Sequence, residues 1–191
     1  MTDYKVTDYK VTDIKPRGKF AIFSVETREV KTPRGLVDYD VVVHQDAVNV
    51  LLIDNETNEV VITKEYRAGA NEIRMATPAG LIEPNEAPID TAVREVYEET
   101  GATLSDIDIV SQFVVSSSEG FTTEELHVFV LKATVHRSDE RHFDPTEYVK
   151  SKWVSFDEVV NLIDKGIIKS APTVSAVRTL QLKLLEAKHG I

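Results

Sequence analysis

Three glutamates near the end of a short helical pattern constrain this chain more than any other feature. The stretch 80–102 predicts a loop followed by a short helix, and Gly101 comes where a left-handed helix cap favours glycine. Glu95, Glu98 and Glu99 are spaced i, i+3 and i+4, so they share one helical face. The opposite face has the spacing of a buried stripe, formed by Ile89, Ala92, Val93 and Val96.

Three acids on one helical face are ordinarily a solvated surface, but here they carry two penalties. Like charges four residues apart repel each other by about 0.2–0.5 kcal/mol, and the C-terminal end of a helix disfavours anions. A divalent cation would reverse both penalties, and carboxylate oxygens suit Mg²⁺ or Mn²⁺, particularly beside a substrate phosphate. The pattern therefore favours a metal site. Gly80 begins the preceding loop, where a backbone without a side chain lets a ligand approach closely.

The same stretch resembles the signature of a known enzyme family, the Nudix hydrolases. Seven identities at fixed spacing match the Nudix box, and chance would produce them at a frequency on the order of 10⁻⁹ per window. The matching residues are Gly80, Glu86, Arg94, Glu95, Glu98, Glu99 and Gly101. The family cleaves a nucleoside diphosphate linked to another group, so the resemblance implies a hydrolase.

The resemblance implies a fold and a set of roles. The fold is of the α+β class, with mixed β-sheets and the box helix in an α/β/α sandwich. Glu95 and Glu99 would bind Mg²⁺ or Mn²⁺, with Glu98 close by. Arg94 and Glu86, like Gly101, would have structural roles within the motif.

A second set of residues resembles one group of this family, the ADP-ribose pyrophosphatases. Arg67 follows a tyrosine about a dozen residues before Pro78-Ala79-Gly80, as in that group. The resemblance implies that Arg67 contacts the diphosphate or the terminal ribose, since a guanidinium forks onto phosphate oxygens. The alternative is a surface arginine paired with Glu65 or Glu72. By the same resemblance the Ala79 carbonyl is a metal ligand, and Gly80 lies beside the substrate.

Two positions depart from the pattern of that group. Ala76 stands where a glutamate is common, and Glu119 replaces a proline in the downstream loop 116–124. Both departures leave the substrate open within the family. The expected reaction is Mg²⁺-dependent hydrolysis of ADP-ribose to AMP and ribose 5-phosphate. The alternatives are another nucleoside diphosphate sugar, an oxidised nucleoside triphosphate, or a nucleotide sensor without catalysis.

The polar loop 138–148 resembles the mobile catalytic loop of the family. Its position before the strand 149–154 makes Glu147 the expected general base, with Glu98 as the second candidate. Glu140 and Asp144 are further candidates in the same loop. The alternative interpretation of this segment is a solvated acidic loop.

The N-terminal 45 residues are expected to form a β arm ahead of a Nudix domain at 46–191. Residues 1–15 repeat a five-residue unit that fits neither helix nor strand, which indicates a flexible or edge segment. Strands at 18–30 and 36–44 flank a turn and predict an antiparallel hairpin. The family resemblance implies that this arm joins two subunits into a homodimer, and Phe20 is a candidate clamp for adenine.

Further elements follow from periodicity. Strands are expected at 47–53, 59–67, 107–115, 126–135 and 149–154. Ser155 begins a capping box for a helix that runs to about Lys165, and Ser170-Ala171-Pro172 begins a last helix. The apolar stripe expected on that last helix comprises Val174, Val177, Leu180 and Leu184.

Composition limits the kinds of partner that the chain can bind. The net charge of −10 makes a nucleic acid an unfavourable partner, because its phosphates require basic surfaces. The chain has no cysteine, which excludes disulfides and thiol chemistry. It has no apolar run of membrane-spanning length and no signal-peptide core at its N-terminus. We therefore expect a cytoplasmic protein without a membrane partner, acting on a small nucleotide.

Overall fold

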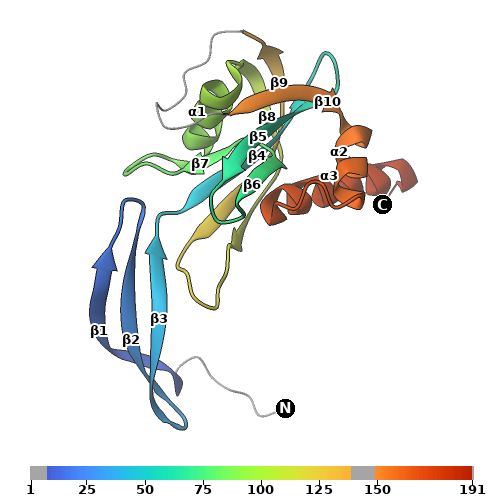
Figure 1. Cartoon of the computed structure of the whole chain (residues 1–191). Helices are drawn as coiled ribbons and strands as arrows, with labels where there is room; N and C mark the ends of the chain where they lie inside the picture. The colour runs from blue at the N-terminus through green and yellow to red at the C-terminus, as the bar shows by residue number, and fades with distance from the viewer. Residues whose placement is uncertain (1–7, 139–148, 191) are drawn as a thin grey trace. The chain divides into compact units, whose positions relative to one another are not determined.

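A mixed β-sheet sandwiched between helices forms the larger of two units in the computed structural model, which describes residues 8–138 and 149–190 (Figure 1). This unit comprises residues 47–115 and 126 onwards. The main strands lie in the order β10-β5-β4-β9-β8, with β4 and β9 parallel and β5 antiparallel to both β4 and β10. Their bounds are β4 Ala47–Asp54, β5 Glu59–Arg67, β8 Thr103–Ser116, β9 Glu125–His136 and β10 Lys150–Ser155.

Each face of this sheet has its own core, because successive strand residues point to opposite faces. Helix α1 (Pro88–Thr100) buries Ala92 and Val96 against one face, together with Val50 of β4. Helices α2 (Phe156–Asp164) and α3 (Ala171–His189) pack on the other face, where Leu51 is buried. The expected α/β/α sandwich is confirmed (Figure 1).

The last helix differs from expectation in its buried stripe. Val177 and Leu180 are buried, but the stripe runs through Thr173 and Ala176 rather than through Val174 and Leu184. Leu184 is 54% exposed. The helix is therefore rotated by about one residue from the expected orientation, because a threonine hydroxyl with a partner can occupy a core position that periodicity assigns to valine.

Two short strands lie where no strand was expected. β6 (Glu72–Ala76) pairs with β5, and β7 (Ala79–Leu81) pairs with β4 within the stretch expected as a loop. In β7, Ala79 is opposite Asn49 and Gly80 is opposite Val48. The segment before α1 is therefore held against the middle of the sheet.

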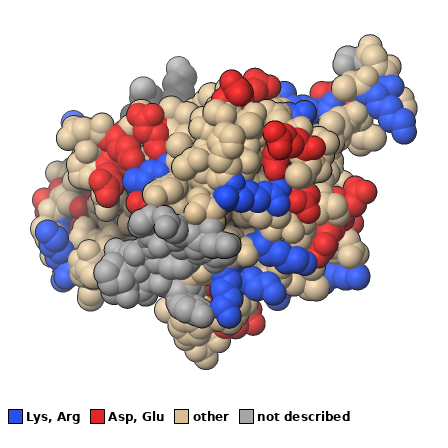
Figure 2. Space-filling model, turned by 90° about the horizontal axis from the view of Figure 1, so that it is seen from above, with Lys and Arg blue, Asp and Glu red and all other residues tan. Residues whose placement is uncertain are grey.

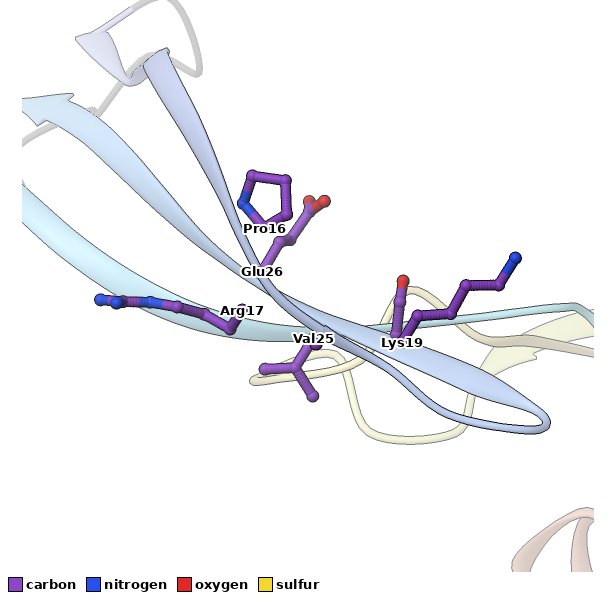
Figure 3. A pocket seen from close by; sticks show the side chains of 7 residues that line it. Pro16, Arg17, Lys19, Val25 and Glu26 are labelled. Atoms are coloured by element: carbon purple, nitrogen blue, oxygen red, sulfur yellow. The ribbon is translucent and has the colours of Figure 1, made fainter.

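The second unit is a three-stranded antiparallel sheet with the adjoining segment 116–125. Strands β2 (Phe23–Thr32) and β3 (Gly35–His44) form the expected hairpin, and β1 (Lys10–Lys19) adds an edge strand within the repetitive N-terminus. In the attached segment, the Phe121 carbonyl accepts a hydrogen bond of 2.7 Å from Val42 N. A shallow hollow on this sheet is lined by residues 16–19 and 24–26 (Figure 3). The division into an arm at 1–45 and a domain at 46–191 stays a prediction.

A cluster of polar side chains ties β9 to the β4–β5 turn and to β10. The Arg137 guanidinium lies 4.1 Å from the ring centroid of Trp153, which is a cation–π geometry. It also pairs with Asp54 at 2.7 Å and with Glu59 at 3.0 Å. Arg137 and Trp153 precede and follow the segment 139–148 in sequence, so both flanks of that segment are joined by one contact.

Charged side chains of both signs are interspersed on the face seen in Figure 2. No helix among the described residues is long and apolar enough to cross a membrane.

Replacing Gly101 with alanine tests the cap of α1. Gly101 has φ of 73° and its N–H donates to the Tyr97 carbonyl. A side chain in this left-handed conformation costs about 1–2 kcal/mol, so we expect Gly101→Ala to lower the free energy of unfolding by that amount in urea titrations. Gly69→Ala is the matched control, because an added Cβ there meets nothing within 4 Å. Equal effects of the two substitutions would contradict the role of the cap.

Candidate active site

Two of the three glutamates on α1 are buried within the protein. Glu95 is 7% exposed and Glu99 is 5% exposed, whereas the Glu98 side chain is 37% exposed. The three share one helical face as expected, but the expectation that this face lies opposite the apolar stripe is wrong. Helix α1 buries Glu95 and Glu99 alongside Ala92 and Val96, because β7 lies over this part of the helix and excludes water from it.

The backbone of β7 is in close contact with these carboxylates. A Cβ added to Gly80 would lie 2.0 Å from Cδ of Glu95, which no side chain tolerates. Ala79 N donates a hydrogen bond of 3.4 Å to Oε1 of Glu99. Gly80 is thus required here for close approach, and the fold brings Ala79, Gly80, Glu95 and Glu99 together.

Glu99 lacks a full set of hydrogen bonds. Its Oε2 atom is buried and has no partner among the described residues. Burial raises the pKa of the Glu99 carboxyl well above its ordinary value, and the charges of Glu95 and Glu65 raise it further, against the lowering effects of Ala79 N–H and Arg67. A buried, unpaired carboxylate oxygen beside a second carboxylate fits a divalent cation, which prefers such oxygen ligands.

Arg94 links the remaining charges of the motif. Its Nη1 donates to Glu95 at 2.7 Å and to Glu98 at 3.0 Å, and its Nη2 donates to the Leu81 carbonyl at 3.0 Å. Its Nε and Nη2 also bind both oxygens of Glu86 at 3.0 Å. The guanidinium therefore neutralises part of the acidic cluster and attaches α1 to the loop before it.

The environment of Glu86 explains its ionisation. The hydrogen bonds from Arg94 lower the pKa of Glu86 to about 2, with further lowering from the Thr91 hydroxyl and Glu83 N–H. Glu86 is thus a carboxylate at every physiological pH, and its charge serves the Arg94 contact. This pairing agrees with the structural roles that the family resemblance implies for both residues.

The other expected site residues differ in how near they lie to the buried carboxylates. Arg67 ends β5 with 51% of its side chain exposed, and it pairs with Glu65 at 2.8 Å, as in the surface-pair alternative. Its charge still lowers the pKa of Glu99, so it lies within electrostatic reach of the buried carboxylates. Phe20 belongs to the other unit and is 56% exposed beside Phe23. Glu147, Glu140 and Asp144 lie outside the described residues.

A buried group of hydroxyls and an amide beside β7 was not foreseen. Thr77 and Asn49 are each 1% exposed, and Thr173 of α3 is fully buried. The Thr77 hydroxyl donates to Asn49 Oδ1 at 2.9 Å. Isolated threonines carry no spacing signal, and residues 77 and 173 are far apart in the sequence, so local patterns do not predict this contact.

The sandwich and its buried carboxylates correspond to a known family. The NUDIX domain model matches residues 43–176. This match covers most of the chain and includes α1 and β7, so the chain belongs to the Nudix family of hydrolases.

Several proteins resemble the chain over most of its length. An ADP-ribose pyrophosphatase of Bacillus subtilis is 29% identical over 163 residues, covering 85% of this chain and 86% of that protein. A methanol dehydrogenase activator of Bacillus methanolicus is 31% identical with the same coverage. A solved ADP compounds hydrolase has a TM-score of 0.79 at 16% identity, covering 99% of this chain and all of the other. That structural likeness shows a shared fold.

Replacing Glu99 with glutamine tests the cost of its buried charge. Because a buried charge costs more than a buried neutral amide, we expect Glu99→Gln to raise the free energy of unfolding of the chelator-treated protein at pH 7. The raised pKa means that the wild type gains stability as pH falls from the folded-state value toward 4.5, a gain that the variant lacks. Glu98→Gln, at the more exposed neighbour, is the control. A loss of stability in Glu99→Gln without metal would contradict this account.

Proposed function

We propose that the protein hydrolyses the diphosphate of ADP-ribose to AMP and ribose 5-phosphate, using Mg²⁺ or Mn²⁺. The observation that carries the proposal is the unpaired carboxylate oxygen of Glu99, buried beside Glu95 and the backbone of β7. A relative aligned over most of the chain is named an ADP-ribose pyrophosphatase, which supports the choice of substrate. The cytoplasmic location stays a prediction from the sequence.

The metal would be held by residues already brought together. Glu95 and Glu99 offer carboxylate oxygens, the Ala79 carbonyl belongs to the segment against them, and Glu98 stands at the rim. When bound, the cation neutralises phosphate charge and acidifies a water molecule. The raised pKa of Glu99 fits this role, because a cation beside the carboxyl favours its charged form.

Residues around the carboxylates would bind the substrate and move the proton. Arg67 would exchange its ion pair with Glu65 for a substrate phosphate, which a half-exposed guanidinium can do at low cost. Gly80 lets the backbone approach Glu95 closely and stays a candidate contact of the diphosphate from the family resemblance. Phe20 stays the candidate for adenine. We propose Glu147 as the base that takes a proton from the attacking water, with Glu98 as the alternative.

A substrate panel tests this function. The purified protein with Mg²⁺ would receive ADP-ribose, ADP-glucose, GDP-mannose, diadenosine polyphosphates, NADH and 8-oxo-dGTP, and products would be separated by chromatography. We expect ADP-ribose to turn over at least about tenfold faster than the others and to yield AMP. Glu99→Gln should reduce kcat at least about 100-fold. Loss of a general base costs about 10²–10⁴ in rate, so comparing Glu147→Gln with Glu98→Gln assigns the proton acceptor.

The outcomes separate the competing hypotheses. Preference for another compound would retain the hydrolase and reject ADP-ribose. Tight binding of a nucleotide without turnover would support the nucleotide sensor and reject the enzyme. Full activity of Glu99→Gln would contradict the proposed metal site.

We further propose that the three-stranded arm joins two copies of the chain. Among its described residues Thr27 alone is buried, so this sheet has no core of its own. Apolar and charged side chains form separate rows across it near the β2–β3 turn. One face carries an apolar row, in which Val11 is opposite Val30 and Val30 is opposite Val37. Asp13, Glu29 and Asp38 form the corresponding row next to it, on the other face.

The apolar face is exposed in the single chain, which supports a partner for it. Val11, Ile14, Val37 and Tyr39 are 40–50% exposed, although all four lie on this face. The polar face is internally satisfied, since Thr27 accepts from Arg17 at 2.7 Å and donates to Asp40 at 2.6 Å. Exposed apolar side chains gathered on a sheet favour a cover in water, and a second copy supplies a surface of the same kind.

Placing a lysine on one face of the sheet or on the other tests whether the dimer forms through the proposed face. We expect sedimentation velocity to show a dimer for the wild type and a monomer for Val37→Lys at micromolar concentration. Asp38→Lys adds the same side chain at the next residue, on the opposite face, and should remain dimeric. A monomeric wild type, or equal dissociation of both variants, would contradict the proposed interface.

A further inference from the structure

A chain of buried hydrogen bonds joins the last helix to the segment that carries the metal-binding backbone. Thr173, in the first turn of α3, accepts a hydrogen bond of 3.1 Å from Thr77 N through its hydroxyl oxygen. The two threonine hydroxyls lie 3.0 Å apart, and Ser170 Oγ lies 3.2 Å from Thr173. Thr173, which also contacts Ser170, thus holds Thr77 through polar contacts between two buried residues.

Strand β4 holds the same residue from a second direction. Asn49 Oδ1 accepts a hydrogen bond of 2.9 Å from the Thr77 hydroxyl, and Asn49 Nδ2 lies 3.4 Å from the Thr77 carbonyl oxygen. The next carbonyl, of Pro78, accepts from Val50 N at 2.9 Å. The peptide groups of residues 77 and 78 are therefore fixed before the chain reaches Ala79.

The orientation of the Ala79 carbonyl follows from these contacts. Thr77 is two residues before Ala79, and the intervening Pro78 has a restricted φ, so little rotation is possible between them. Gly80 then passes over the Glu95 carboxyl at a distance that leaves no room for adjustment. Any shift of Thr77 would move a carbonyl that must lie within a few tenths of an ångström of its ligand position.

We propose that Thr173 is a positioning residue for the metal site: through Thr77 its hydroxyl orients the Ala79 carbonyl toward the cation. The inference rests on the proposed function only in taking that carbonyl as a ligand. Thr173 touches neither substrate nor metal. Groups that support metal ligands in this way typically change metal affinity by about 10–100-fold when they are removed.

Two substitutions at residue 173 separate the hydroxyl from simple packing. Thr173→Val keeps the volume and removes the hydroxyl, whereas Thr173→Ser keeps the hydroxyl and removes a methyl group. We expect Thr173→Val to raise the dissociation constant for Mn²⁺ about tenfold, and Thr173→Ser to stay within about twofold of the wild type. A packing role predicts the reverse order, because the serine leaves a cavity.

The measurement is Mn²⁺ binding by electron paramagnetic resonance without substrate, with melting temperature recorded for each variant. In turnover assays, excess Mg²⁺ should restore the kcat of folded Thr173→Val, since its defect lies in metal affinity. Unchanged Mn²⁺ affinity in Thr173→Val, or a larger loss in Thr173→Ser, overturns the inference. If Mn²⁺ binds with the expected pattern but ADP-ribose is not cleaved, the positioning role stands and the choice of substrate fails. If the wild type binds no Mn²⁺, both proposals fail.

Discussion

The packing of α1 on the sheet keeps two carboxylates out of water on its inner face, and the rest of the structure has to accommodate them. Glu95 and Glu99 occupy positions that a helix packed on a sheet would normally give to apolar side chains. Their desolvation opposes folding, and the surrounding apolar core has to outweigh it. In the proposed function these carboxylates are a pair of preorganised oxygen ligands, which need no rearrangement when a cation arrives. The site and the core are therefore built from the same helix.

Arg94 makes this arrangement tolerable. A guanidinium can serve several carboxylates at once because its donors form a planar fork, and here it contacts Glu86, Glu95 and Glu98. It does not bond to Oε2 of Glu99, the proposed ligand atom, which has no partner in the described part of the chain. The permanent positive charge of Arg94 thus neutralises most of the acidic cluster. The negative charge of Glu99 is left for a cation that can bind and leave. A lysine could not reproduce this distribution.

The spacing of apolar and charged residues along the chain predicted most helices and long strands. The spacing of the box residues predicted α1 with its cap at Gly101, and alternation predicted the main strands of the sheet. Burial of Glu95 and Glu99 was missed because a helical periodicity cannot tell that β7 covers the charged face. β7 itself is too short to show alternation, and the rotation of α3 depends on a hydrogen bond to Thr77. These features arise from contacts between distant segments, which no window of sequence contains.

The link between Thr77 and Thr173 also bears on when the site can form. Residues 79–99 leave the ribosome long before Thr173 is synthesised, because 96 positions separate the two threonines. Strands β9 and β10 of the central sheet are also made after α1. Chains emerge at about 5–20 residues per second, so a nascent chain carries the box helix for several seconds without a complete site. Chains cut short before α3 would retain all the box residues and still lack the hydrogen bonds that Thr173 gives to the segment before Ala79.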